Sequence, residues 1–170
     1  MDDSDNPFLR VTYMELRDPP APAQRLDTER VARETLSTSK YLALYRDVGG
    51  PLRWDQRLRM PEAQLEALLD GGSLHIYVLR SVHGDALGFC EFDRGALPEI
   101  ELKNFGLIPS AQSRGLGPWL LSVALREEWN SCPTRIWLHT DTWDHPAAIR
   151  VYERAGFRVY AVRDEAADLL

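Results

Sequence analysis

Short runs in which apolar and polar residues alternate predict several β-strands, because successive side chains of a strand point to opposite faces. These runs occupy residues 8–16, 74–80, 86–93, 99–108, 135–140 and 157–162. Residues 28–36 are ambiguous, since Val31, Arg33 and Thr35 alternate as in a strand while the composition also tolerates a helix. We favour a strand there.

Apolar residues recur with a helical period in four other segments, at residues 40–48, 61–69, 118–129 and 146–155. The first segment follows Ser37 and Ser39, either of which can cap a helix, and ends at a pair of glycines. It places four apolar side chains on one stripe, namely Tyr41, Leu44, Tyr45 and Val48. The second segment begins with a proline and also ends at two glycines, which is typical of helix boundaries.

The order of these elements predicts the fold class. Residues 82–85 separate two strands by a short turn, which indicates a β-hairpin, and a third strand follows before the chain changes to helix, strand, helix, strand. We therefore expect an α/β (α+β) fold with a mixed, mostly antiparallel central sheet flanked by helices. In such sheets ligands bind beyond the carboxyl ends of the strands.

Composition narrows the class of protein. The chain has 170 residues, of which 44% are hydrophobic, and this suits a single domain over residues 1–170 with residues 1–7 as a disordered tail. Cys90 and Cys132 lie in unrelated segments, the N-terminus lacks a signal sequence, and no apolar run approaches the ~20 residues that cross a bilayer. We expect a cytoplasmic protein without membrane or nucleic acid partners, since the net charge of -6 favours a cationic or amine partner.

A glycine-bearing turn connects the strand at residues 99–108 with the helix at residues 118–129. It reads Gln112-Ser113-Arg114-Gly115-Leu116-Gly117 and is followed by Pro118, which suits the first helical position. Such a turn leaves backbone N–H groups converging at the positive end of a helix dipole, where they can hold a phosphate. Arg114 can add a charge-assisted contact. Because many similar turns bind nothing, the rest of the chain has to support a phosphate site.

Two motifs make the chain resemble the GCN5-related N-acetyltransferase (GNAT) superfamily. The turn matches the superfamily pattern (Gln/Arg)-x-x-Gly-x-(Gly/Ala). A second pattern, Asn-x-x-Ala-x-x-x-Tyr-x-x-x-Gly-Phe, is matched from His145 to Phe157 with histidine in place of the leading asparagine. Residues 137–148, Trp-Leu-His-Thr-Asp-Thr-Trp-Asp-His-Pro-Ala-Ala, also resemble a group of bacterial acetyltransferases whose substrates are mostly unassigned. The resemblance is best over residues 72–162.

This resemblance implies a GNAT-like acyl-CoA N-acyltransferase fold with acetyl-CoA as co-substrate. In the superfamily the turn binds the pyrophosphate, and the pantetheine arm lies between two parallel strands that splay apart. Leu107 would then supply the N–H that stabilises the oxyanion, and Gly106 would form the bulge that opens the strand. The implied cofactor-binding residues are Leu107, Gln112, Ser113, Arg114, Gly115, Leu116, Gly117, His145, Ala148 and Tyr152.

Acetyl transfer to an amine needs a base, because alkyl amines are mostly protonated at neutral pH. Glu101 is the first candidate, since its place before the turn resembles that of the base in histone acetyltransferases. Glu99 shares its strand face, and Glu91 or a water chain could serve instead. These glutamates could equally be solvated strand residues paired with Lys103 or Arg94.

Tyr152 occupies the tyrosine position of the second motif, where the resemblance implies a proton donor to the leaving thiolate. Its structural alternative is packing with Ile149 and Phe157. The variable region is expected to line the acceptor pocket, with Tyr45, Trp54 and Glu91 as candidate substrate-binding residues and Tyr41, Arg46 and Arg57 nearby in sequence. The aromatic residues could instead belong to the core.

We therefore expect an N-acetyltransferase whose acceptor, a small-molecule or protein amine, attacks acetyl-CoA directly in a ternary complex. The first rival is a non-catalytic acyl-CoA-binding sensor or scaffold. The second is a metal-dependent hydrolase built on His139, Asp141, Asp144 and His145. Their spacing argues against a metal, because His139 belongs to a strand and Asp144 and His145 fit a helix cap. No metal is expected, and a homodimer is left open.

Overall fold

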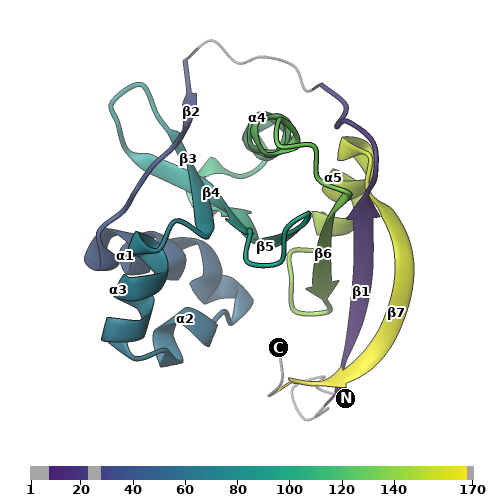
Figure 1. Cartoon of the computed structure of the whole chain (residues 1–170). Helices are drawn as coiled ribbons and strands as arrows, with labels where there is room; N and C mark the ends of the chain where they lie inside the picture. Colours follow the sequence, from purple (N-terminus) through teal and green to yellow (C-terminus); the bar gives the residue numbers. More distant parts are fainter. Residues whose placement is uncertain (1–7, 23–27, 168–170) are drawn as a thin grey trace.

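The structure is a computed structural model that describes residues 8–22 and 28–167 (Figure 1). The tail expected at residues 1–7 lies outside the described residues. The strands form one mixed sheet in the order β2-β3-β4-β5-β6-β1-β7, as the sequence predicted for the fold class. Their bounds are β1 Phe8–Leu16, β2 Arg30–Arg33, β3 Leu74–Arg80, β4 Ala86–Asp93, β5 Glu99–Leu107, β6 Arg135–Asp141 and β7 Arg158–Ala166.

Most neighbouring strands run antiparallel, including the consecutive β3, β4 and β5. The exception is the pair β5 and β6, which is parallel and ends after the register positions Glu99↔Arg135, Ile100↔Ile136 and Glu101↔Trp137. β1 lies between β6 and β7 and is antiparallel to both. The first strand of the chain therefore completes the half of the sheet that the last two strands form, a position that the sequence did not predict.

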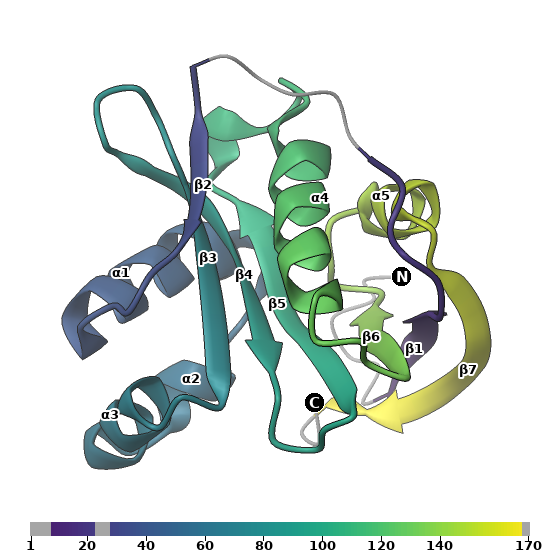
Figure 2. The ribbon, with the colours of Figure 1, turned by 45° about the horizontal axis from the view of Figure 1, so that its top comes forward.

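Helices cover the two faces of the sheet unequally (Figures 1 and 2). α4 and α5 lie on one face, while α1, α2 and α3 gather on the other face beside β3, β4 and β5. Opposite α5, no helix of the described residues covers β6, β1 and β7. The helix bounds are α1 Thr38–Gly49, α2 Gln56–Arg59, α3 Glu62–Asp70, α4 Leu116–Trp129 and α5 Ala148–Ala155, with 3₁₀ turns η2 Gly50–Leu52 and η3 Pro109–Ala111.

The local sequence explains α1. Ser37 is its N-cap and accepts a hydrogen bond from the Lys40 N–H, which satisfies one of the free donors of the first turn. The stripe predicted from the sequence is buried, and it packs with Ile76 and Val78 of β3 and with Phe89 of β4. A second cluster on the opposite face joins α4 and α5 to the sheet. The sheet thus has apolar contacts on both faces over its antiparallel half.

Some boundaries differ from the prediction. α4 begins two residues before Pro118, so this proline lies within the first turn, where its missing N–H still has no intrahelical partner to lose. α5 begins at Ala148 rather than at residue 146, and the strand expected over residues 28–36 is limited to β2. α2 was not predicted, because a helix of four residues is too short to show a period.

Gly106 does not form the bulge that opens β5. The register between β4 and β5 shifts where Glu91 pairs with Asn104 and Phe92 pairs with Leu102, so Lys103 is the extra residue. The φ angle of Gly106 is not positive either. A glycine is required there for another reason, since a Cβ would lie 2.6 Å from Val48 Cγ1 of α1. Gly106 therefore permits the close approach of α1 to β5.

Candidate active site

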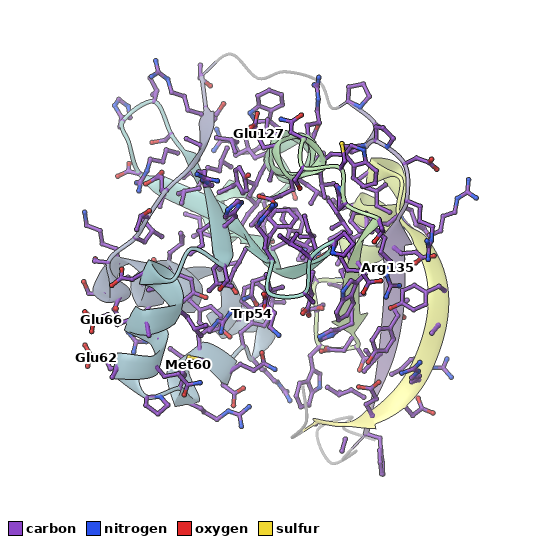
Figure 3. The ribbon with its side chains drawn as sticks, in the orientation of Figure 1. Trp54, Met60, Glu62, Glu66, Glu127 and Arg135 are labelled. Atoms are coloured by element: carbon purple, nitrogen blue, oxygen red, sulfur yellow. The ribbon has the colours of Figure 1, made fainter. Side chains whose placement is uncertain are left out.

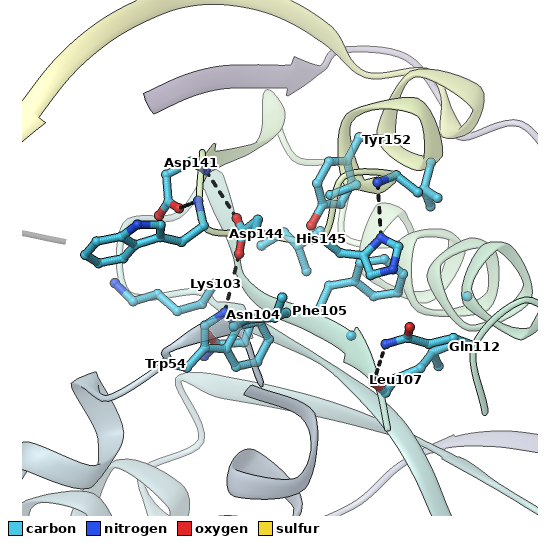
Figure 4. Close-up of a pocket in the computed structure, with 18 of the residues that line it drawn as sticks. Trp54, Lys103, Asn104, Phe105, Leu107, Gln112, Asp141, Asp144, His145 and Tyr152 are labelled. Atoms are coloured by element: carbon cyan, nitrogen blue, oxygen red, sulfur yellow. Dashed lines mark hydrogen bonds between the residues drawn. The ribbon is translucent and has the colours of Figure 1, made fainter. Parts of the chain in front are cut away.

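A cavity of about 420 Å³ opens where β5 and β6 cease to pair (Figure 4). Residues 102–107 of β5 line it on one side, and His139 and Asp141 of β6 line it on the other. The turn before α4, the start of α5 and residues 52–56 complete the wall. The cavity lies beyond the carboxyl end of the parallel ladder, where the sequence led us to expect a ligand.

The turn before α4 forms one end of this cavity, and Gln112, Ser113, Gly115, Leu116 and Gly117 all line it. Ser113 and Gly115 have φ angles of 61° and 73°. Such left-handed residues directly before a helix orient successive N–H groups toward one concave surface that suits an anion. We refer to this end as the turn end.

Arg114 points elsewhere. Its Nη2 lies 3.1 Å from Glu29 Oε1, and it is absent from the described residues that line the cavity. The expected contact between Arg114 and a phosphate stays a prediction.

The strand register directs the N–H of Leu107 toward the cavity. Ile108 N–H donates to Leu87 C=O at 2.9 Å, and the next pair along the strands is Leu107 with Gly88. Because hydrogen-bonded and non-hydrogen-bonded pairs alternate in an antiparallel ladder, the Leu107 N–H points away from β4. β6 has already diverged on that side, so this donor is available to a ligand.

Tyr152 lines the cavity (Figure 4), and its ring packs against those of Phe105 and Phe157, with centroids 5.8 and 5.9 Å away. Its hydroxyl has no hydrogen-bond partner among residues 8–22 and 28–167. Burial raises the pKa of Tyr152 well above its ordinary value, and the charge of Asp144 adds to this effect. The phenol therefore keeps its proton at neutral pH and can donate a hydrogen bond into the cavity.

His145 and Asp144 share the segment before α5 but have different roles. His145 Nδ1 accepts a hydrogen bond from the Ala147 N–H at 3.1 Å, and the His145 C=O accepts one from the Ala148 N–H at 2.9 Å. Asp144 does not cap α5 as its position suggested. It accepts hydrogen bonds from the Thr140 hydroxyl and the Asp141 N–H, and from Trp54 Nε1 at 3.4 Å.

Side chains from distant segments form the opposite end of the cavity, which we call the side-chain end. Figure 4 shows Asp141, Lys103 and Trp54 there, away from Gln112. Trp54 lies between the helical layer and the sheet (Figure 3) and packs against Tyr45 with ring centroids 5.6 Å apart. The lining further includes Trp143, whose ring lies 5.0 Å from the Arg53 guanidinium carbon, and His139.

The carboxylate of Asp141 is part of the side-chain end. It accepts a hydrogen bond from the Trp143 N–H at 2.7 Å. Burial raises the pKa of Asp141, and the neighbouring charge of Asp144 raises it further. From the sequence, Asp141 and His139 were candidates only for a metal site, Lys103 only for an ion pair with a glutamate, and Trp143 had no assigned role. His139, Asp141 and Trp143 shared one signal, the segment at residues 137–148, which marked the family without assigning roles to its side chains.

The three candidate base residues have distinct surroundings. Glu91 is fully buried and binds Tyr41, Arg57 and Asn104, with the Arg57 Nη2 at 2.6 Å. Glu99 binds Arg135 at 2.8 Å. Glu101 lies 3.8 Å from Lys103 Nζ, and it does not itself line the cavity among the described residues.

The described residues contain no group of three or more His, Cys, Asp or Glu side chains that could hold a metal ion. None of their helices is long and apolar enough to cross a membrane.

Comparison with known proteins identifies relatives. A family model described as the acetyltransferase (GNAT) family matches residues 41–157. A comparison with curated proteins finds no match.

Several solved structures share the fold. A GCN5-related N-acetyltransferase from Sphaerobacter thermophilus has a TM-score of 0.67 at 17% identity over 95% of this chain and 52% of its own. A tandem GNAT protein from the clavulanic acid biosynthesis pathway has a TM-score of 0.65 at 19% identity over 94% and 52%. The ribosomal-protein-S18-alanine N-acetyltransferase from Escherichia coli has a TM-score of 0.62 at 22% identity over 79% and 81%. The chain therefore spans about half the length of the first two structures.

Proposed function

The chain belongs to the GNAT family of acetyltransferases, and we propose that it is an N-acetyltransferase that transfers the acetyl group of acetyl-CoA to an amine. The observation that carries the proposal is the cavity between the diverging strands β5 and β6, which begins at the turn before α4. Its turn end supplies main-chain donors for the pyrophosphate of coenzyme A. Its length along β5 then leaves room for the pantetheine arm and the thioester.

The proposed mechanism is direct attack of the amine on the thioester in a ternary complex. As the C–N bond forms, the carbonyl oxygen becomes an oxyanion that the Leu107 N–H stabilises. The C–S bond then breaks, and the Tyr152 hydroxyl donates to the sulfur of coenzyme A. The protonated state of Tyr152 at neutral pH supports this role. Glu101 is the carboxylate that the sequence led us to expect as the acceptor of the amine proton.

An amine acceptor, small or protein-borne, suits the side-chain end of the cavity. Asp141 offers a carboxylate to a cation, and Trp54 and Trp143 offer aromatic faces beside it. The name of the Escherichia coli relative, an alanine N-acetyltransferase, supports nitrogen as the acceptor atom. The chain's own acceptor is to be found by a screen.

The test combines calorimetry with a thiol-release screen. We expect the protein to bind coenzyme A and acetyl-CoA, and to release thiol from acetyl-CoA with at least one member of a panel of primary amines and N-terminal peptides. Tyr152→Phe is expected to lower kcat about 100-fold with unchanged coenzyme A affinity. Tyr160→Phe, at an exposed tyrosine of β7, is the matched control. Binding without turnover for every amine would instead indicate a sensor, and absence of binding would exclude both functions.

A further inference from the structure

Glu101, the expected base, lies behind the cavity wall. Lys103 and His139 line the cavity, and Glu101 lies between them, with its Oε1 at 3.8 Å from Lys103 Nζ and at 4.0 Å from His139 Nε2. The Glu101 side chain is 15% exposed. Glu101 is also the last β5 residue of the parallel ladder, so the space between the strands opens only after it. Of these two possible proton acceptors, only the imidazole lines the cavity among the described residues.

The two ring nitrogens of His139 have different surroundings. Its Nδ1 is buried and has no hydrogen-bond partner in residues 8–22 and 28–167. Because Nδ1 is enclosed by protein, Nε2 is the ring nitrogen that is left to accept a proton from a ligand. The ring is held from the other side by Tyr13 of β1, with centroids 5.9 Å apart. The ring thus lies between Tyr13 and Glu101 while lining the cavity.

From this geometry we infer that His139 is the residue that removes the proton from the acceptor amine, and that Glu101 is a positioning residue that stabilises the resulting imidazolium. The inference rests on the proposed function. It reassigns the contact with the amine from the carboxylate to the imidazole. It also gives a role to a histidine that the sequence analysis had considered only as a metal ligand.

The proton transfers balance. The amine nitrogen forms a bond to the thioester carbon and loses one proton, which His139 Nε2 accepts. The C–S bond breaks, and the sulfur takes its proton from the Tyr152 hydroxyl. Water then returns a proton to Tyr152 and removes one from His139. The carboxylate of Glu101 stays ionised throughout and attracts the positive charge that forms on the ring.

The charges around His139 set the expected pH behaviour. Glu101 and Lys103 face it from β5, Tyr13 faces it from β1, and Asp141 lies two residues further along β6. Glu101 favours the imidazolium and Lys103 opposes it.

The decisive test needs no acceptor. The chain has four histidines, so the imidazole resonances can be followed by ¹H–¹⁵N NMR over a pH series and assigned with His139→Gln. In Glu101→Gln, the titration midpoint of His139 is expected to shift to lower pH while His75, His83 and His145 stay in place. The control is Glu127→Gln, at an exposed residue of α4 well away from Trp54 (Figure 3). An unmoved His139 midpoint would overturn the inference.

Enzyme kinetics then distinguish the general base from the positioning residue. With acetyl-CoA and the panel amine that gives the fastest thiol release, His139→Gln is expected to lower kcat/KM about 100-fold and to abolish its fall at acidic pH. Glu101→Gln should keep that fall and move it to lower pH. His83→Gln, at an exposed turn, is the matched control. The inference is wrong if Glu101→Gln abolishes the acidic fall and His139→Gln retains it.

Calorimetry with coenzyme A distinguishes failure of this inference from failure of the proposed function. All variants are expected to bind coenzyme A as the wild type does, because neither residue lies at the turn end. If the wild type neither binds coenzyme A nor releases thiol, the proposed function fails, and the kinetic role of His139 fails with it. If binding and turnover persist while the two residues behave in the reverse manner, only the inference fails.

Discussion

The two ends of the cavity differ in the groups that line them: main-chain N–H groups at one end and side chains at the other. The turn end consists mainly of main-chain donors within residues 112–117, beside the N-terminus of α4. The side-chain end draws its groups from segments far apart in the chain. The contact between Trp54 and Asp144, for example, joins residues that are 90 positions apart. A ligand is therefore held by backbone geometry at one end and by tertiary packing at the other.

This difference indicates which changes each end tolerates. A backbone site depends on a few φ angles and keeps its donors when side chains change. A site of packed side chains depends on every element that holds it, and its chemistry can change without any change of fold. We expect substitutions that break the packing or the buried ion pair behind the side-chain end to cost the most stability, and substitutions in the turn to act mainly on coenzyme A affinity.

The largest effect on stability is expected at Glu91, which joins the elements behind the side-chain end. Its carboxylate binds Arg57 of α2 and Asn104 beside the β5 bulge, and it is fully buried. Glu91→Ala leaves the buried Arg57 guanidinium without its counter-charge, so we expect a loss of about 3–5 kcal/mol in the free energy of unfolding. Urea denaturation measures this loss.

A double variant tests whether the loss comes from the unpaired charge. Arg57→Met combined with Glu91→Leu replaces the ion pair by apolar side chains and should recover more than half of the stability lost in Glu91→Ala. If the double variant is as unstable as Glu91→Ala, the pair matters through its shape and not through charge. A change of less than about 1 kcal/mol in Glu91→Ala would contradict the burial of the pair.

The next effect concerns Gly106, where the helical layer meets β5. A Cβ at this position would lie 2.6 Å from Val48 Cγ1, so Gly106→Ala must displace α1 or β5 and should cost about 1–3 kcal/mol. Val48→Ala makes room for the added methyl group. In a double-mutant cycle followed by thermal unfolding, the two changes together should therefore cost less than their sum. Additive losses would show that the two residues do not meet.

The sequence predicted the local elements of the fold well and their arrangement less well. β1, β3 and β4 have the predicted bounds, because alternation and flanking turns are local signals. The position of β1 between β6 and β7 depends on pairing with strands more than a hundred residues later, for example Val11 with Asp141. Nothing in the run at residues 8–16 specifies that pairing. α2 was missed because its four residues show no period.

The two ends of the candidate site also differ in how far the sequence predicts them. The turn end could be located from six consecutive residues, because a glycine turn between strand and helix determines its own backbone. The side-chain end could not, since Trp54, Lys103 and Asp141 meet only after three elements have packed. Strand alternation placed Glu99 and Glu101 on one face but could not predict the bulge at Lys103. It also could not show that His139 lies between Glu101 and the cavity.

A smaller effect on stability, with a specific effect on binding, is expected at Gly115 of the turn end. Its φ of 73° is strained for any residue with a Cβ, although the space around it is open, so Gly115→Ala should cost about 1–2 kcal/mol. It should also weaken coenzyme A binding about tenfold, measured by calorimetry. Gly84→Ala is the control, because Gly84 has a φ of 87° and open space in the β3–β4 turn. Equal weakening of binding in both variants would show that strain alone, and not the turn end, is responsible.

The smallest effect is expected at Asp141 of the side-chain end, and it depends on pH. The pKa of Asp141 is raised in the folded state from the ordinary value of 3.8, chiefly by burial. Just above pH 3.8 the native state therefore binds more protons than the unfolded chain. The stability of the fold falls as the pH rises through this window. Asp141→Asn removes the buried charge and should stabilise the protein at pH 7 by less than about 1 kcal/mol, with no gain at pH 3. Thermal unfolding at the two pH values measures the difference, with the exposed Asp85→Asn as control. Coenzyme A affinity should not change, because that ligand is held at the turn end; a gain that persists at pH 3 would contradict the electrostatic cause.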